Sequence, residues 1–141
     1  MNKRINLILI GTFVIGLSMR MHGQEILNKE WVIVKIEKEK ITTDVEKAPW
    51  IKLSERRVSG FSGCNRLMGS YLLEGKTLFF SQLGGTKMFC FDTQELEDKF
   101  MKTLSKTHFW KSKRGKLYLF DQNKTAIMTF EIKKHSFYDK G

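Results

Sequence analysis

The feature that most constrains the fold is a series of short apolar segments, rich in β-branched residues and separated by turn residues. Such segments are typical of β-strands with one buried and one exposed face. They lie at residues 31–36, 50–53, 57–61, 70–73, 77–80, 117–120 and 126–132. Because most connections between them are short, neighbouring strands are expected to pair in an antiparallel sheet.

A single segment has the spacing of an α-helix. Leu96, Phe100 and Leu104 recur every four residues and would share one apolar face. Asp92 is placed to cap this helix, and Glu95 follows three residues later, as in a capping box. One helix among about seven strands predicts a single α+β domain, a curved and mostly antiparallel β-sheet with the α-helix packed on it.

Glycine and polar residues mark the predicted connections. The polar stretch 38–48 is expected to be a loop, and Gly63 with Asn65 is expected to form a tight turn. The pair Gly84-Gly85 is expected to break the chain after a strand. Further turns are expected at residues 74–76, 114–115 and 121–124.

The N-terminal segment has the order of a secretory signal peptide, with basic, then apolar, then small residues. Lys3 and Arg4 precede an apolar run over residues 5–17, which is shorter than the roughly 17–25 residues that a spanning helix needs. We therefore predict a signal peptide over residues 1–23, cleaved after Gly23. The alternative is a retained membrane anchor.

A cleaved signal peptide predicts export to the periplasm or out of the cell. The mature chain would then hold one domain over residues 24–134 and a short tail over residues 135–141. No N-terminal lipid anchor is expected, because the only cysteines are Cys64 and Cys90, far from the apolar run. We expect a monomer that does not span the membrane after cleavage.

The net charge of +10 is unevenly distributed along the chain. Residues 24–98 carry 11 basic and 12 acidic side chains, whereas residues 99–141 carry 11 basic and 3 acidic ones. Because an exported protein rarely meets DNA or RNA, we expect a localised basic surface and no nucleic-acid partner.

A basic hairpin around Gly115 forms part of this charged region. Its charges are Lys111, Lys113, Arg114 and Lys116. One interpretation is solvated charge that protects a sheet edge from pairing with other chains. The other is contact with an anionic envelope surface, such as lipid head groups or polysaccharide. Both remain open at the level of sequence.

Two motifs connect these elements to a known family. The run Gly-Phe-Ser-Gly-Cys-Asn-Arg ends at Arg66, and Thr-Lys-Met-Phe-Cys ends at Cys90, directly before the predicted helix. With the Trp31 strand at the start, this pattern resembles the META domain, also known from the heat-shock protein HslJ, over roughly residues 27–132. The motif residues are Gly63, Cys64, Asn65, Arg66, Thr86, Met88 and Cys90.

The resemblance implies an α+β fold and an envelope or secreted location, and it supplies no catalytic reaction. Some members of the family are linked to heat shock and stress response. We therefore predict an exported binding or envelope stress-tolerance protein without enzymatic activity or cofactor. An alternative is an accessory, chaperone-like or inhibitor module that docks another envelope protein. Its partner would be that protein or an anionic envelope surface.

The motif side chains allow more than one interpretation. Cys64 and Cys90 could form a disulfide in an oxidising compartment, or remain buried free thiols. Asn65 suits an irregular turn, and Arg66 could pair with a helix acid such as Glu95 or Glu97. The alternative for Arg66 is a small polar site for an anionic ligand.

Catalytic and metal sites are the weakest interpretations. A nucleophile formed by either cysteine with His108 has only its residue types in support. A zinc site from Cys64, Cys90, His108 and His135 lacks the closely spaced ligand pairs of structural zinc sites. We expect no catalytic residues and no metal.

Overall fold

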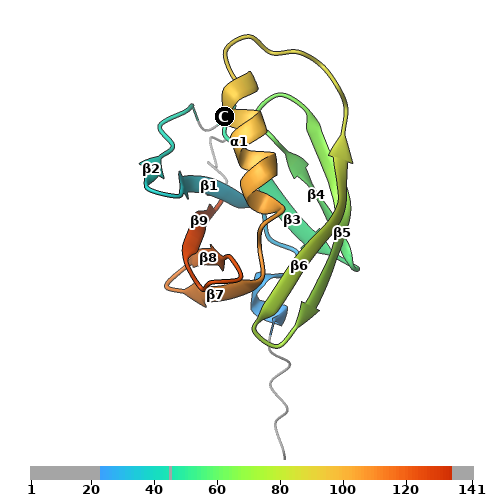
Figure 1. Ribbon diagram of the computed structural model, residues 1–141, viewed down its shortest axis with the longest axis vertical. Coiled ribbons are helices and arrows are strands. Elements are labelled where there is room, and N and C mark those ends of the chain that lie inside the picture. Colours follow the sequence, from blue (N-terminus) through green and yellow to red (C-terminus); the bar gives the residue numbers. More distant parts are fainter. Residues whose placement is uncertain (1–22, 45, 135–141) are drawn as a thin grey trace, which may run out of the picture.

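The computed structural model describes residues 23–44 and 46–134, which contain nine strands and one α-helix (Figure 1). The predicted signal peptide, except Gly23, and the tail 135–141 lie outside the described residues. A 3-10 turn, η1, precedes the sheet. The elements are η1 (Gln24–Ile26), β1 (Trp31–Ile36), β2 (Glu39–Lys40), β3 (Trp50–Ser54), β4 (Arg57–Phe61), β5 (Arg66–Glu74), β6 (Thr77–Gly85), α1 (Gln94–Leu104), β7 (Phe109–Lys113), β8 (Lys116–Phe120) and β9 (Ala126–Ile132).

All nine strands belong to one antiparallel sheet, in the order β2-β1-β3-β4-β5-β6-β7-β8-β9. Strand β1 also pairs with β9, so the curved sheet closes on itself. Trp31, for example, lies opposite Ile51 of β3 and Ile132 of β9. The shortest pairing in the ring is β6 with β7, which meet at Thr77 and Phe109.

The helix α1 packs against the concave side of this sheet. Figure 1 shows it with β1 and β9 on one side and β4, β5 and β6 on the other. Phe100 and Leu104 are completely buried, and the Phe100 ring meets the Phe130 ring edge-on at 6.3 Å between centroids. Leu96 is partly buried against the same core. The predicted fold class and the apolar face of the helix are therefore confirmed.

The predicted cap of the helix is wrong. The helix begins at Gln94, its N-cap residue is Thr93, and no side chain caps it. Asp92 is exposed in the preceding turn, and the N–H groups of Thr93 and Gln94 donate to the carbonyl of Cys90. Backbone hydrogen bonds thus form this turn, and the capping box of Asp92 and Glu95 is not needed.

The predicted break at Gly84-Gly85 is also wrong, because β6 continues to Gly85 opposite Leu67. A Cβ atom on Gly85 would lie 1.7 Å from the Arg66 carbonyl oxygen. Glycine is therefore used here for a close approach of two strands, and not for a turn. Two other bounds differ from the prediction: β5 begins at Arg66, four residues before the predicted start, and the expected loop 38–48 contains the short strand β2.

Candidate functional site

Asn65 is the centre of a buried hydrogen-bond network in the turn between β4 and β5. Its side-chain Nδ2 donates to both carboxylate oxygens of Glu97 and to the Met88 carbonyl, each at 3.0 Å. Its Oδ1 accepts from the Met88 N–H at 2.7 Å and from the Thr86 hydroxyl at 2.9 Å. One side chain therefore joins the turn, the connection before α1 and the helix itself.

Glu97 is the partner of Asn65, whereas the sequence suggested Arg66 as its partner. Glu97 is only 8% exposed, and its carboxylate accepts hydrogen bonds from Asn65 and, at 2.5 Å, from the Ser62 hydroxyl. The one sequence signal was its position, because Glu97 lies on the same helix face as Phe100 and Leu104. A buried carboxylate needs such donors to offset its loss of water.

The two cysteines form a disulfide between Cys64 and Cys90, whose Cα atoms are 5.8 Å apart. Cys64 is buried in the β4–β5 turn, and Cys90 is half-buried directly before α1. The disulfide and Asn65 therefore fasten the same two segments together. Because both cysteines are in the disulfide, neither is a free thiol that could pair with His108. The His108 Nδ1 lies 3.0 Å from the Lys106 carbonyl oxygen instead.

The second motif contributes mainly backbone contacts. The Thr86 N–H donates to the Arg66 carbonyl at 3.3 Å, and the Arg66 N–H donates to the Thr86 hydroxyl at 3.1 Å. The Met88 side chain is 61% exposed, and Phe89 and Phe91 are 75% and 89% exposed. The segment thus has a fixed backbone and a row of apolar side chains in water.

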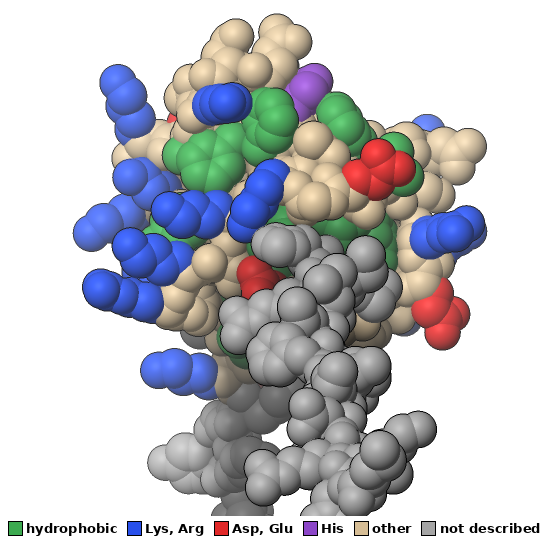
Figure 2. All heavy atoms as spheres, turned by 90° about the horizontal axis from the view of Figure 1, so that it is seen from below, with side chains coloured by type: hydrophobic (Ala, Val, Ile, Leu, Met, Phe, Trp, Pro, Cys, Tyr) green, Lys and Arg blue, Asp and Glu red, His purple; other side chains and the backbone are tan. Residues whose placement is uncertain are grey.

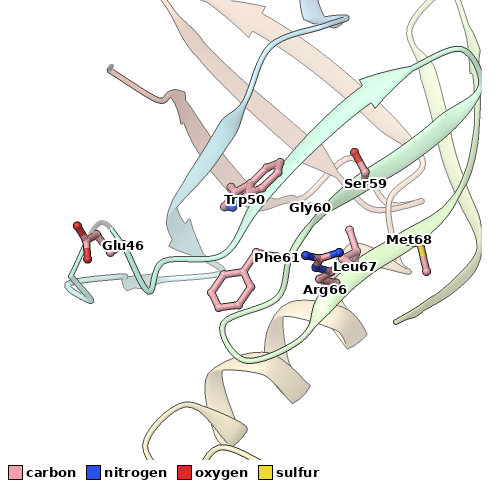
Figure 3. Close-up of a pocket in the computed structure, with 8 residues that line it drawn as sticks. All are labelled: Glu46, Trp50, Ser59, Gly60, Phe61, Arg66, Leu67 and Met68. Atoms are coloured by element: carbon pink, nitrogen blue, oxygen red, sulfur yellow. The ribbon is translucent and has the colours of Figure 1, made fainter. Parts of the chain in front are cut away.

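Arg66 does not pair with Glu95 or Glu97, so that prediction is wrong. It is the first residue of β5, and the alternation of that strand directs Arg66 outward while Leu67 is buried. It lines a pocket of about 570 Å³ on the outer face of β3, β4 and β5, which we call the Arg66 pocket (Figure 3). The other lining residues are Glu46, Trp50, Ser59, Gly60, Phe61, Leu67 and Met68.

The predicted basic hairpin is present as β7 and β8, which pair from Phe109–Phe120 to Lys113–Lys116. Beside the hairpin lies a hollow of about 430 Å³, which is lined by three aromatic residues and by Lys76, Lys111 and Lys124. Figure 2 shows Lys and Arg side chains gathered on this side of the molecule, next to apolar ones. We define the basic face as Lys76, Lys111, Lys113, Arg114, Lys116 and Lys124.

The lysines of the hollow lie near its aromatic rings. The Lys76 ammonium is 5.1 Å from the Trp110 ring centre, and that of Lys124 is 5.8 Å from the Phe109 ring centre. Strand β7 pairs with β6 only at Thr77 and Phe109, so the β6-facing edge of residues 111–113 is unpaired. This unpaired edge fits the interpretation that the charges of the hairpin protect a sheet edge.

Residues 23–44 and 46–134 contain no group of three or more His, Cys, Asp or Glu side chains that could hold a metal ion, and His135 lies outside this part. None of the helices in the same part is long and apolar enough to cross a membrane. Away from both sites, the hydrogen bond to Glu39 raises the pKa of the Lys99 ammonium.

Solved structures with the same fold include two determined by NMR. One is a protein from Burkholderia xenovorans, with 28% identity, a TM-score of 0.63 and coverage of 79% of this chain and 86% of that chain. The other has 23% identity, a TM-score of 0.60 and coverage of 77% and 92%. A DUF4847 family protein from Bacteroides vulgatus shares the fold at 13% identity, with a TM-score of 0.57 and coverage of 75% and 93%.

The fold and the two linked motifs therefore define a small α+β domain of a known kind. The META domain model matches residues 24–134, and the chain belongs to the META domain family. A search of curated proteins finds no match.

Proposed function

We propose that the chain is an exported META protein that acts by binding, and that its basic face contacts an anionic surface of the cell envelope. Export is supported by the signal-peptide pattern of residues 1–23 and by the disulfide, since disulfides persist in oxidising compartments. The resemblance to heat-shock members of the family supports a role in envelope stress tolerance. No catalytic step is part of the proposal.

The observation that carries the proposal is the concentration of positive charge on one face, with few carboxylates to neutralise it among the described residues. Of the six residues of the basic face, Lys116 alone has a carboxylate partner among the described residues, Glu131 at 3.3 Å. Lys111 is exposed in the middle of β7, and Lys113 and Arg114 are exposed at the tip of the hairpin. Charges without an internal partner remain available to an external anion.

The expected binding energy follows from the number of charges. A basic residue near an anionic membrane contributes about 1 kcal/mol. Removing three of them should therefore cost about 3 kcal/mol, which is roughly a hundredfold in affinity. The loss should be measurable even if the other basic residues still bind.

The test is sedimentation of the mature chain with vesicles that contain phosphatidylglycerol, compared with vesicles of phosphatidylcholine alone. The variant Lys111→Gln/Lys113→Gln/Arg114→Gln removes three charges from the basic face. A matched control, Lys38→Gln/Lys40→Gln/Lys47→Gln, removes three exposed charges from the segment between β1 and β3. Soluble polygalacturonate serves as an anionic competitor without lipid.

The proposal predicts that the wild-type chain binds the anionic vesicles. The triple variant of Lys111, Lys113 and Arg114, which we call the hairpin variant, should lose most of this affinity, and the control variant should keep it. Release by polygalacturonate would assign the affinity to charge shared by lipids and polysaccharides. Equal losses in the two variants would contradict the proposal, as would equal binding to both kinds of vesicle, because a general charge effect or an apolar contact would then explain the result.

A second candidate function is docking of another envelope protein through the segment before α1. Met88, Phe89 and Phe91 are exposed there as three large apolar side chains, and the disulfide at Cys90 holds the segment. Rigid exposed aromatic residues are typical anchors of protein interfaces. Phe89→Ser/Phe91→Ser should abolish capture of such a partner while leaving vesicle binding unchanged.

A further inference from the structure

Arg66 is a charged side chain without a partner among residues 23–44 and 46–134. In the described part of the chain its backbone bonds to Thr86, but its guanidinium makes no hydrogen bond, ion pair or ring contact. It is exposed on the outer face of β5, at the wall of the Arg66 pocket. A guanidinium offers a planar fork of donors that matches a carboxylate or phosphate.

The pocket next to this charge is mostly apolar. The strand register places Trp50 opposite Phe61 and Phe61 opposite Arg66, so two aromatic residues and the arginine lie in one row across three strands. Met68 lines the same pocket from the outer face of β5. Figure 3 shows Phe61 and Arg66 next to each other, with Glu46 on a loop at the other end.

The backbone that presents Arg66 is held in place on both sides. Asn65, the residue before it, is fixed by Glu97, Thr86 and Met88. Gly85 lets β6 approach the Arg66 carbonyl closely. The hydrogen-bonded turn around Asn65 thus ends in an outward-facing arginine. A fixed backbone lowers the entropy that a ligand must overcome on binding.

We propose that the Arg66 pocket binds a small amphipathic carboxylate, with its anionic group on the Arg66 guanidinium and its apolar body over Phe61 and Trp50. The volume of about 570 Å³ lies within the range of small-molecule sites. Glu46, at the opposite end, disfavours a second anionic group there. The site is separate from the basic face, so it stands or falls independently of the proposed function.

The test uses decanoate, kept below its micelle-forming concentration, as the probe. Decanol and decylamine have the same chain length with a neutral or a positive head group. Binding is followed by NMR chemical shifts of the Trp50 indole and by calorimetry. Arg66→Gln removes the charge, and Arg57→Gln is the matched control, because Arg57 is also exposed and lies outside the pocket at the start of β4. Phe61→Ala tests the apolar floor.

The proposal predicts that decanoate binds, that decanol binds more weakly and that decylamine does not bind. Arg66→Gln should lose about tenfold in affinity, the size of one charge-assisted contact, while Arg57→Gln should stay within twofold of wild type. Thermal unfolding of Arg66→Gln close to that of wild type would show that the variant is folded. Equal binding of decanoate and decanol, no binding of decanoate, or binding that Arg66→Gln leaves unchanged would overturn the proposal. Binding only to carboxylate-bearing vesicles, and not to free decanoate, would overturn it as well.

Discussion

Replacement of Asn65 by alanine is the sharpest test of the buried network. The substitution removes five hydrogen bonds, three donated by Nδ2 and two accepted by Oδ1. The buried Glu97 carboxylate would keep only Ser62 as a donor among the described residues. A hydrogen bond to a charged group contributes about 1.5–3 kcal/mol, and an unsatisfied buried polar group costs about 1–3 kcal/mol.

We take about 2 kcal/mol for Glu97 and about 1 kcal/mol for the Met88 backbone groups, which lie nearer the surface. The expected loss is therefore about 3 kcal/mol out of the 5–15 kcal/mol or so that stabilises a typical domain. For a domain of this size it corresponds to a fall in Tm of about 12 °C. The measurement is reversible unfolding by denaturant, with the disulfide intact in both proteins.

The matched control is Asn123→Ala, because Asn123 is exposed in the turn after β8 and its backbone N–H, which donates to Asp121, is unaffected. It should change the free energy of unfolding by less than about 0.5 kcal/mol. Asn65→Asp should destabilise at least as much as Asn65→Ala, since it places a second carboxylate against Glu97. A loss below about 1 kcal/mol for Asn65→Ala would refute the reasoning, because substitutions at exposed positions already change the free energy of unfolding by nearly that much.

Three further substitutions test other contacts. Cys64→Ala/Cys90→Ala should lower the free energy of unfolding by about 3 kcal/mol through loss of the disulfide, and failure of the wild type to gain two hydrogens in mass on reduction would contradict the pairing. Gly85→Ala should cost about 1–3 kcal/mol because its Cβ meets the Arg66 carbonyl, whereas Gly84→Ala, which meets nothing within 4 Å, should cost less; equal losses would speak against a close approach. Glu39→Gln should destabilise slightly below about pH 10, where lysine is charged in the folded and unfolded chain, and the difference should vanish as the pH rises through the raised pKa of Lys99. Unfolding at about pH 8 and about pH 12 would measure it, and a difference that persists at the higher pH would exclude the ion pair as its cause.

The fold could be predicted from the sequence because its signals are local. The alternation of apolar residues in the strands, and the spacing of Phe100 and Leu104 in the helix, can be recognised without knowing which segments meet in the fold. The errors occur where a distant contact changes the meaning of a local signal. Gly84-Gly85 is read as a break, but Gly85 serves the approach of β6 to β5. Asp92 is read as a cap, but the turn is held by the Cys90 carbonyl.

The candidate site shows the same limit. The motif residues can be found in the sequence. Their partners cannot, because these depend on which face of the sheet each side chain points to at the start of β5. Asn65 turns inward to Glu97, and Arg66 turns outward to Trp50 and Phe61. Likewise, Lys76 and Lys124 join the basic face only because β6 and the turn after β8 lie beside β7. Charge counts alone do not give this arrangement.

The salt dependence of vesicle binding tests the central claim most directly, because screening weakens contacts between exposed charges in proportion to how many take part. The affinity of the wild-type chain for phosphatidylglycerol vesicles would be measured over a range of salt concentrations, together with the variants of Lys111, Lys113 and Arg114 and of Lys38, Lys40 and Lys47. The basic face predicts a steep fall for wild type and the control, and a shallower one for the hairpin variant. The same slope in all three proteins would contradict it.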